Sequence, residues 1–369
     1  MDLTHRVFEF ADDIGPEKIV HLYEPRSQTK AIVVIDNVAA GPALGGVRMA
    51  LDVTTTEVVR LSRSMTYKNI MAGLPHGGGK SGIIADPKTV NKEHVIRTFA
   101  RGINSLTDYI PGPDMGTDET SMAYVYDETG RAAGLPRELG GIPLDEIGAT
   151  AYGTAVCADI AQEYINLDLN GARLTIEGFG NVGKPAARFF AERGAILVGA
   201  SDSNGTIYNK NGLDVDDLIR IKETTGSVTN YKDGEVLEST DLLMISTDIF
   251  LPAARPDVIN EGNSDVIDAG LIIEAANIPI TEKAEKILHD RGILVIPDFI
   301  ANAGGVITAS VEYHGGTETQ AFDRIKYSIS RNTKEILDKV YSENTYPRDT
   351  AVSIAKQRVL RAMKYREWI

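Results

Sequence analysis

Two lysines and one aspartate stand at positions where their charges can do chemistry. Lys68 interrupts an otherwise apolar face of the helix that we expect over residues 54–74, and Lys80 directly follows three glycines. Asp114 lies in the Pro- and Gly-rich segment 111–117. One ammonium group can hold an anionic part of a substrate, whereas a second, crowded by the first and partly desolvated, has its pKa lowered and can act as a base. A carboxylate beside them can exchange protons with the reacting atom.

Each of these residues also has a purely structural interpretation. A lysine such as Lys68 often packs its stem against apolar neighbours and extends its ammonium group to water. An aspartate in a turn, such as Asp114, often bonds to its own backbone. The glycines before Lys80 predict a loop whose backbone approaches a ligand and aims the lysine at it. Taken together, the three residues form a candidate catalytic group.

A glycine pattern of the form G-x-G-x-x-G spans residues 178–183. It follows the strand-like ARLTIE and opens the helix-like KPAARFFAERG, which is the context that a dinucleotide fingerprint requires. The first glycine permits the turn, the second lets the backbone approach a pyrophosphate, and the third lets the helix sit close to the strand. The predicted cofactor-binding residues are therefore Gly178, Gly180, Asn181, Val182 and Gly183. An ordinary glycine-rich turn is the alternative.

The choice between NAD and NADP depends on the end of the next predicted strand. That strand, ILVGAS, ends in Asp202, whose carboxylate can accept hydrogen bonds from a ribose 2′-hydroxyl, which favours NAD. A 2′-phosphate requires cationic neighbours instead, and Lys210 is a candidate. The sequence therefore favours NAD and leaves NADP open.

Short apolar runs alternate with amphipathic stretches in the second half of the chain. The runs of strand length are ARLTIEGFG, ILVGASD, DLLMIS, VIDAGLIIEAAN and GILVIPDFIANAGG. Strands separated by helices indicate a parallel sheet covered on both faces, so we expect a doubly wound α/β fold there. Before it, residues 31–37 predict a strand, and Thr54 with Glu57 predicts a capping box that begins a helix. Segment 134–149 is the expected interdomain connection, and residues after 318 predict amphipathic helices.

Length and composition indicate a folded protein of two domains. With 369 residues, of which 43% are hydrophobic and 24% charged, the chain falls outside the disordered, collagen-like and disulfide-rich classes. A net charge of -14 repels phosphate backbones and anionic lipids, so neither nucleic acid nor a membrane is an expected partner. The single cysteine, Cys157, predicts a buried, unreactive thiol. Residues 1–20 lack a signal-peptide pattern, so we expect a cytoplasmic protein, and no His or Cys cluster predicts a metal.

A series of short motifs resembles, in the same order, those of the amino acid dehydrogenases that act on glutamate, leucine, valine and phenylalanine. The motifs are GPALGGVRM (41–49), MTYKN, LPHGGGKSGI, PDMGT, ATAYG, GFGNVG, EAANIPIT (274–281) and PDFIANAGGV (297–306). The resemblance implies an α/β protein with an N-terminal substrate and assembly domain over residues 1–140, a C-terminal Rossmann domain over 145–335, and a cleft between them. Residues 340–369 are candidates to pack back on the first domain.

The resemblance also implies roles for particular residues. In similar enzymes the lysine matching Lys68 binds the substrate α-carboxylate, the lysine matching Lys80 activates water and the carbon-nitrogen centre, and the aspartate matching Asp114 shuttles protons. The implied reaction is reversible: hydride leaves Cα for the nicotinamide, water attacks the iminium, and ammonia departs from the 2-oxo acid.

Further motifs imply contacts with the cofactor and substrate. Thr150 and Asn277 resemble residues that contact the nicotinamide ribose or carboxamide, and Asn302 resembles one that helps to hold the substrate. The resemblance implies a homo-oligomer, a hexamer or an octamer, and small-molecule amino acid and 2-oxo acid substrates.

The substrate side chain depends on a small group of residues. Similar glutamate enzymes place a lysine before the Gly-Gly of the first motif, where it pairs with the γ-carboxylate; this chain has Leu44 there, followed by Gly45. Val306 and Ala309 match apolar pocket residues of leucine-type enzymes, and Ala309 replaces the serine of glutamate enzymes. Burying an unpaired carboxylate there is unfavourable, whereas an aliphatic side chain gains about 0.8 kcal/mol per buried CH₂. We therefore expect leucine, isoleucine, valine or a similar amino acid as substrate.

Three alternatives stay open at this point. Ser310 directly follows Ala309, so a shift of one residue in the matching restores the serine of a glutamate dehydrogenase, and segments 113–116 and 137–141 look more like glutamate enzymes. Small pocket residues also leave room for an aromatic ring. From another class comes a nucleotide-binding sensor without catalysis, although a sensor has no need of both lysines and the aspartate.

Overall fold

A computed structural model describes residues 8–88 and 90–368 of the chain, and these form two compact units. Unit 1 comprises the described chain up to Pro143, together with Val306–Ala321 and the part from Val352 onward; unit 2 comprises Leu144–Gly305 and Phe322–Ala351. Each unit is assembled from segments that are separated in the sequence. Val306–Ala321 falls in unit 1 because its helix packs apolar side chains against the strands of that unit.

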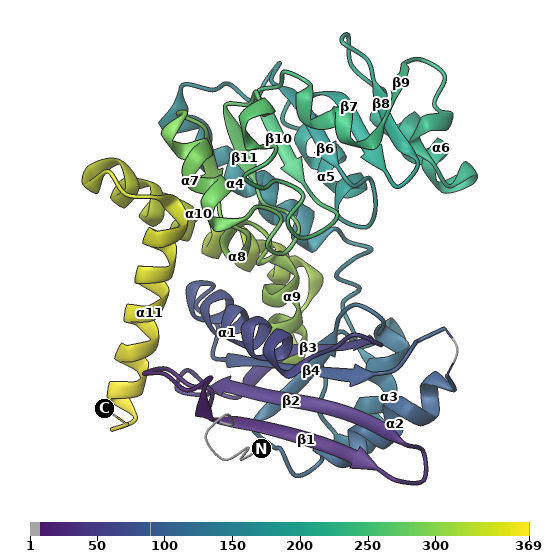
Figure 1. Ribbon diagram of the computed structural model, residues 1–369, viewed down its shortest axis with the longest axis vertical. Helices are drawn as coiled ribbons and strands as arrows, with labels where there is room; N and C mark the ends of the chain where they lie inside the picture. Colours follow the sequence, from purple (N-terminus) through teal and green to yellow (C-terminus); the bar gives the residue numbers. More distant parts are fainter. Residues whose placement is uncertain (1–7, 89, 369) are drawn as a thin grey trace. The chain divides into compact units, whose positions relative to one another are not determined.

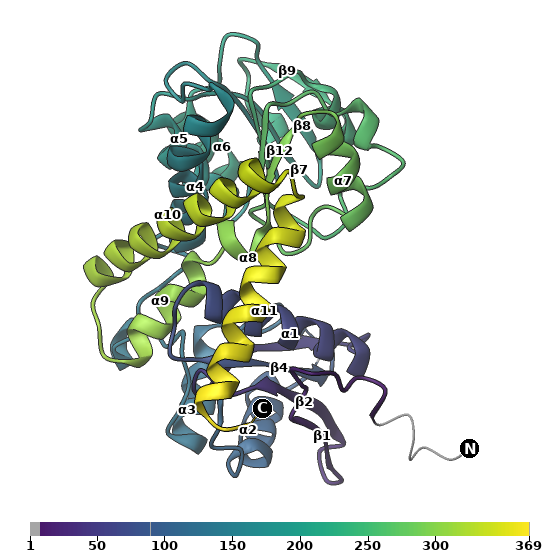
Figure 2. The same ribbon diagram turned by 90° about the vertical axis from the view of Figure 1, so that its left-hand side faces the viewer.

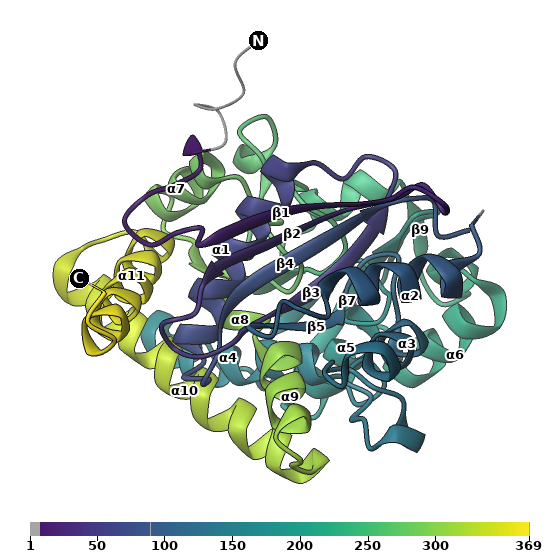
Figure 3. The same ribbon diagram turned by 90° about the horizontal axis from the view of Figure 1, so that it is seen from below.

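Unit 1 is an α/β layer structure around a mixed sheet (Figure 1). Its elements are β1 (Lys18–Glu24), β2 (Thr29–Asn37), β3 (Ala43–Ala50), α1 (Thr55–Met71), β4 (Gly77–Ile84), α2 (Lys92–Ile103), β5 (Tyr109–Pro113) and α3 (Glu119–Thr129). The strand order is β1-β2-β4-β3-β5, and Figure 3 looks onto these strands side by side. The three strands β4, β3 and β5 run parallel to one another, whereas β1, β2 and β4 are antiparallel neighbours.

The sheet of unit 1 is covered on both faces, which explains the unbroken apolar run of β2. Val33 and Ile35 face a core that includes Phe99 of α2, whereas Ile32 and Val34 face Val58 of α1 and its neighbours. Alternate residues of every strand therefore divide between an α2–α3 face and an α1 face. The α1 face carries the candidate catalytic group.

Unit 2 is built on the expected doubly wound sheet. Its elements are α4 (Ala149–Ile165), β6 (Arg173–Glu177), α5 (Gly183–Ala191), β7 (Ile196–Asp202), β8 (Gly205–Tyr208), α6 (Val215–Thr225), β9 (Glu235–Leu237), β10 (Ile249–Pro252), β11 (Leu271–Ile273), α7 (Glu282–Asp290), β12 (Leu294–Ile296) and α8 (Asp298–Ala301). The strand order is β12-β11-β10-β6-β7-β8-β9, with the first five parallel. Because β6 lies between β7 and β10, its carboxyl end is the switch point where such folds bind ligands.

Three helices at the end of the chain contain residues of both units. They are α9 (Gly304–Tyr313), α10 (Glu318–Glu343) and α11 (Pro347–Tyr365), and Figure 2 shows α10 and α11 following one another. They confirm the amphipathic helices expected after residue 318. None of the helices within residues 8–88 and 90–368 is long and apolar enough to cross a membrane.

Three local expectations were wrong. Residues 77–82 lie in the buried strand β4 and not in a loop, because the missing side chains leave room for neighbours: a Cβ on Gly78 would lie 2.1 Å from the backbone nitrogen of Thr66 in α1. The first four residues of the run DLLMIS lie in the 3₁₀ helix Ser239–Met244, and the strand of that region is β10. Thr54 caps α1 as expected, accepting from the backbone of Glu57, but the Glu57 carboxylate bonds Arg48 instead of closing a capping box.

Candidate active site

Lys80 and Asp114 meet above strand β3. Lys80 stands on β4 and Asp114 directly follows β5, so the two strands that flank β3 carry them. The register pairs Gly46 of β3 with Gly112 of β5, and Val47 with Ser81 of β4. Lys80 Nζ lies 3.1 Å from Asp114 Oδ1, and the two side chains are only 7% and 15% exposed. The lysine and the aspartate predicted from the sequence are therefore an ion pair in a largely dry setting.

Gly46 leaves the space in which this pair forms. A Cβ built on Gly46 would lie 2.7 Å from the Cβ of Asp114 and 3.2 Å from the Nζ of Lys80. Any side chain at this position would therefore displace one partner or the other. Gly46, the third glycine of the GPALGGVRM motif, therefore gives Lys80 and Asp114 the room in which they meet.

Arg48 is a member of the site that sequence reasoning missed. Its Nε lies 2.9 Å from Asp114 Oδ2 and its Nη1 lies 2.5 Å from Glu57 Oε1. Burial alone would raise the pKa of Asp114, but attraction to Lys80 and Arg48 outweighs burial and holds that pKa below its ordinary value. The available signal was the alternation of β3, which places Arg48 on the same face as Leu44 and Gly46.

The turn after β5 holds Asp114 in place. Thr117 Oγ1 accepts from the backbone N–H of Asp114 at 3.0 Å and donates to the carbonyl of Val47 at 2.7 Å. The carboxylate is therefore free to face Lys80 and Arg48, and the turn does not depend on it. The interpretation of Asp114 as a simple turn-former does not describe its side chain.

Lys68 is buried on α1, with 9% of the residue exposed, and α1 packs against β4, the strand of Lys80. A lysine buried to this degree does not match the alternative in which the Lys68 ammonium group extends to water. Its predicted contact with a substrate carboxylate stays a prediction.

An apolar cluster adjoins the charged group on the same face of the sheet. It consists of Leu44, Ile110, Ala133 and Ala309, with Val306 packed against it. Gly45, next to Leu44, accepts a hydrogen bond at its carbonyl from the Tyr109 hydroxyl at 2.9 Å. We call these five side chains the Leu44 cluster. No member carries a charge or a side-chain hydrogen-bond donor.

The Ser310 side chain contacts His76. His76 is 1% exposed, its Nδ1 lies 3.3 Å from the Pro42 carbonyl, and its Nε2 lies 3.1 Å from Ser310 Oγ. A carbonyl can only accept, so Nδ1 carries the proton and Nε2 accepts from the serine. Burial lowers the pKa of His76 to about 4. The shifted matching in which Ser310 would serve a substrate carboxylate is thereby disfavoured, and His76 occupies a buried, structural position.

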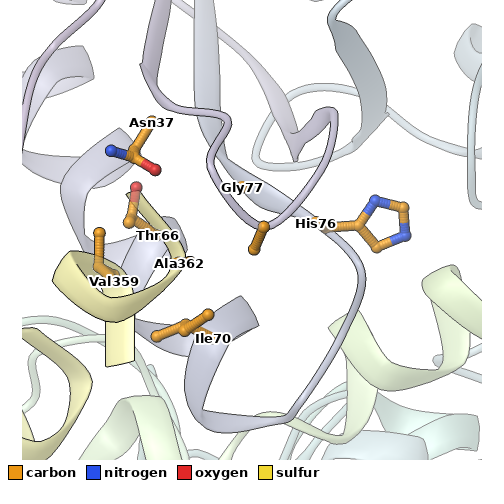
Figure 4. Close-up of a pocket in the computed structure, with 8 residues that line it drawn as sticks. Asn37, Thr66, Ile70, His76, Gly77, Val359 and Ala362 are labelled. Atoms are coloured by element: carbon orange, nitrogen blue, oxygen red, sulfur yellow. The ribbon is translucent and has the colours of Figure 1, made fainter. Parts of the chain in front are cut away.

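A shallow hollow beside His76 has no part in the charged group. Figure 4 shows the His76 ring directed away from the side chains of Ile70 and Val359. The hollow is lined by Asn37, Ala40, Thr66, Ile70, His76, Gly77, Val359 and Ala362. Neither Lys80 nor Asp114 is among them, and we assign no chemistry to it.

The glycine loop of unit 2 has the backbone that a dinucleotide needs. Gly178 has φ +92°, a conformation that favours glycine, and a Cβ on Gly183 would lie 2.0 Å from the Gly178 carbonyl. A Cβ on Gly180, by contrast, would meet nothing within 4 Å, so open space lies above the second glycine. The loop runs from β6 into the N-terminus of α5, where free amides attract a pyrophosphate. Asn181 and Val182 lie in the same loop, as predicted.

Comparisons with known proteins agree with this arrangement. A family model described as Glutamate/Leucine/Phenylalanine/Valine dehydrogenase matches residues 140–367, and one described as Glu/Leu/Phe/Val dehydrogenase, dimerisation domain, matches residues 17–131. The chain belongs to the Glu/Leu/Phe/Val dehydrogenase family. It is an amino acid dehydrogenase that uses NAD or NADP.

Relatives of this dehydrogenase include enzymes for both cofactors. The chain is 40% identical to the glutamate dehydrogenase of Aeropyrum pernix, which it matches over 90% of its own length and 85% of the relative. It is 38% identical to the NADP-specific glutamate dehydrogenase of Saccharolobus shibatae (89% and 83% covered) and 35% identical to the catabolic NAD-specific glutamate dehydrogenase of Bacillus subtilis (90% and 83% covered).

Solved structures with the same fold belong to enzymes that are named for different amino acids. The hetero-hexameric glutamate dehydrogenase of Thermus thermophilus, in a Leu-bound form, superposes with a TM-score of 0.86 at 26% identity, covering 95% of this chain and 90% of that one. The L-tryptophan dehydrogenase of Nostoc punctiforme superposes with a TM-score of 0.75 at 26% identity, covering 98% and 99%.

The remaining predicted residues of the dehydrogenase lie in unit 2. Asn302 Nδ2 donates to the Ala276 carbonyl at 3.0 Å and to Asn277 Oδ1 at 3.2 Å, so the two predicted asparagines are neighbours. Asn302 Oδ1 is buried and has no hydrogen-bond partner within the described part of the chain. Thr150 lies in the first turn of α4, and a Cβ on Gly305 would lie 3.1 Å from its hydroxyl. An unpaired amide oxygen is suited to a ligand donor, and the roles of all three residues stay predictions.

Cys157 is buried, and burial raises the pKa of its thiol to about 12. The expectation of an unreactive thiol agrees with this environment.

Proposed function

We propose that the enzyme oxidatively deaminates an L-amino acid with an apolar side chain, such as leucine, isoleucine or valine, to its 2-oxo acid. The observation that carries the proposal is the composition of the Leu44 cluster next to the Lys80–Asp114 pair. Leu44 is 1% exposed and stands where similar glutamate enzymes place a lysine. A substrate carboxylate placed there would be buried without a partner, which costs several kcal/mol.

Glutamate is the second candidate, and the comparisons by themselves favour it. The relatives reported above, at 35% to 40% identity, are all named glutamate dehydrogenase. Against it stand Leu44 and Ala309, neither of which can bond a γ-carboxylate. The names describe those relatives, whereas the side-chain preference of this enzyme depends on the residues of its own cluster.

In the proposed mechanism the bound cofactor supplies a hydride acceptor for the substrate Cα. Lys68 holds the substrate α-carboxylate. Lys80 passes a proton to Asp114 and, once neutral, removes a proton from the water that attacks the iminium carbon. Asp114 returns the proton to the departing nitrogen. The substrate α-ammonium group loses one proton before the hydride leaves, so that amino acid, water and oxidised cofactor give 2-oxo acid, ammonium, reduced cofactor and that one proton. The 3.1 Å contact between Lys80 Nζ and Asp114 Oδ1 supports this proton path.

We further propose that the enzyme works as a homo-oligomer. Support comes from the family description of residues 17–131 as a dimerisation domain. Size-exclusion chromatography with light scattering tests this: a mass equal to one chain, about 40 kDa, would contradict it.

A panel of L-amino acids tests the substrate proposal. Purified enzyme is assayed by the absorbance of the reduced cofactor, with leucine, isoleucine, valine, phenylalanine, tryptophan and glutamate as substrates. We expect the highest kcat/KM for an aliphatic amino acid. A higher value for glutamate would overturn the proposal in favour of the second candidate, and no turnover of any amino acid would favour the sensor.

The variant Leu44→Lys tests the residue that carries the argument. A buried ammonium in the Leu44 cluster should lower kcat/KM for leucine and raise it for glutamate, by about tenfold or more in ratio, since each 1.4 kcal/mol is a factor of ten. Leu44→Met is the matched control, because it keeps an apolar side chain of similar volume. An unchanged ratio in Leu44→Lys would mean that Leu44 does not face the substrate.

A further inference from the structure

We propose that the enzyme binds NADPH more tightly than NADH, with Lys222 as the residue that recognises the 2′-phosphate. The inference rests on the NAD(P) dependence of the family and is independent of the substrate side chain. It concerns the end of β7, where folds of this type contact the adenosine ribose.

The Asp202 carboxylate is already fully used by the protein. Its Oδ2 accepts from Lys222 Nζ at 2.7 Å and from the Val228 backbone at 2.8 Å. Its Oδ1 accepts from the Asn204 backbone at 2.8 Å and from Ser227 Oγ at 3.3 Å. A carboxylate offers about four acceptor positions, so these donors leave none for a ribose 2′-hydroxyl. The interaction that would select NAD is therefore missing.

Lys222 neutralises the negative charge of the Asp202 carboxylate at the end of β7. It stands in the last turn of α6, and its side chain is 20% exposed while that of Asp202 is 6% exposed. The pair is neutral overall, so Asp202 does not repel a phosphate as an unpaired carboxylate would. A 2′-phosphate next to Asp202 thus meets a cation and no uncompensated negative charge.

The ammonium of Lys222 also keeps donor capacity for a ligand. One N–H is directed to Asp202 and another to the Gly226 carbonyl at 2.8 Å. A lysine has three donors, and the third has no acceptor within the described residues of the chain. A phosphate oxygen can take this donor in a charge-assisted hydrogen bond, which a 2′-hydroxyl cannot match.

Direct binding measurements test the proposal without any amino acid present. The fluorescence of NADPH and NADH is titrated with wild-type enzyme, and we expect the dissociation constant of NADPH to be lower by about tenfold, as for one charge-assisted bond. Adenosine 2′,5′-bisphosphate should displace NADH at a lower concentration than AMP does. Tighter binding of NADH, or equal displacement by the two fragments, would overturn the proposal.

Variants assign the effect to Lys222. Lys222→Met should weaken NADPH binding by about tenfold and leave NADH binding unchanged or stronger, whereas Lys222→Arg should retain the preference. Lys210→Ala tests the other cation that the sequence offered for the 2′-phosphate; Lys210 is exposed in the same unit, and we expect this variant to keep the wild-type preference for NADPH. Equal loss of both cofactors in folded Lys222→Met, or selective loss of NADPH in Lys210→Ala, would contradict the assignment. The comparison of adenosine 2′,5′-bisphosphate with AMP uses the wild-type enzyme, so it tests the proposal even if Lys222→Met fails to fold. Its outcome does not bear on the proposed amino acid substrate.

Discussion

Adding one methyl group at Gly46 should separate the side chains of Lys80 and Asp114, to which we assign catalysis. A Cβ at this position would lie 2.7 Å from the Cβ of Asp114 and 2.8 Å from the carbonyl oxygen of Pro113. Ordinary van der Waals contacts begin at 3.4 Å, so Asp114 must move by about 0.7 Å in Gly46→Ala. The Lys80–Asp114 contact is already 3.1 Å long, near the upper end of a hydrogen bond, and does not survive such a shift.

The expected cost falls mainly on catalysis. A displacement of about 1 Å in a catalytic group lowers the rate by about 10²-fold. Overpacking of a well-packed interior costs about 1 to 3 kcal/mol of unfolding free energy. We therefore expect a folded variant whose kcat is lower by about 10²-fold and whose cofactor binding is unchanged, since the glycine loop lies in the other unit.

Gly112→Ala is the matched control for this experiment. Gly112 is paired with Gly46 across β3 and β5, but a Cβ there would meet only the Ala133 carbonyl, at 3.8 Å. Its kcat should stay within about twofold of the wild type. Steady-state kinetics with reduced-cofactor absorbance and urea unfolding of both variants provide the comparison. A folded Gly46→Ala with wild-type kcat would refute the idea that Lys80 and Asp114 act together across β3.

Three further changes probe other parts of unit 1. Lys80→Ala should lower kcat by about 10² to 10⁴-fold while cofactor titrations stay unchanged, and a wild-type rate would remove this lysine from the mechanism. Burial lowers the pKa of His76 to about 4 in the folded protein, against 6.5 in the unfolded chain, so its neutral form contributes stability above pH 6.5 that is lost as the pH falls toward 4. In urea unfolding at pH 6.5 and pH 4, about 3 kcal/mol of this pH dependence should be missing from His76→Gln. An identical pH dependence in the wild type and the variant would contradict the role of His76. Glu312 accepts backbone hydrogen bonds from Gly134, Leu135 and Ile142, so Glu312→Gln should lower the unfolding free energy by about 2 kcal/mol, which an unchanged urea midpoint would disprove.

Local patterns predicted the elements that form the candidate cofactor-binding loop. The β6–loop–α5 segment follows from the order of strand, glycines and helix, because each glycine answers a local need: positive φ, open space, or close packing of helix on strand. The end of β7 at Asp202 was predicted in the same way. Such features depend on residues close together in sequence, so the sequence reveals them without knowledge of the remaining fold.

The sequence by itself determined the two-unit α/β fold, the family and the identity of Lys80 and Asp114 as candidates, because residue types and short-range periodicity carry that information. Only the tertiary structure decided what surrounds those residues. Strand register, set by the whole sheet, brings Arg48 to Asp114 and makes Gly46 indispensable, and a distant helix supplies the lysine that occupies Asp202. Hydrogen bonds and charges act over a few ångströms of space, and the chain folds residues far apart in sequence into that range.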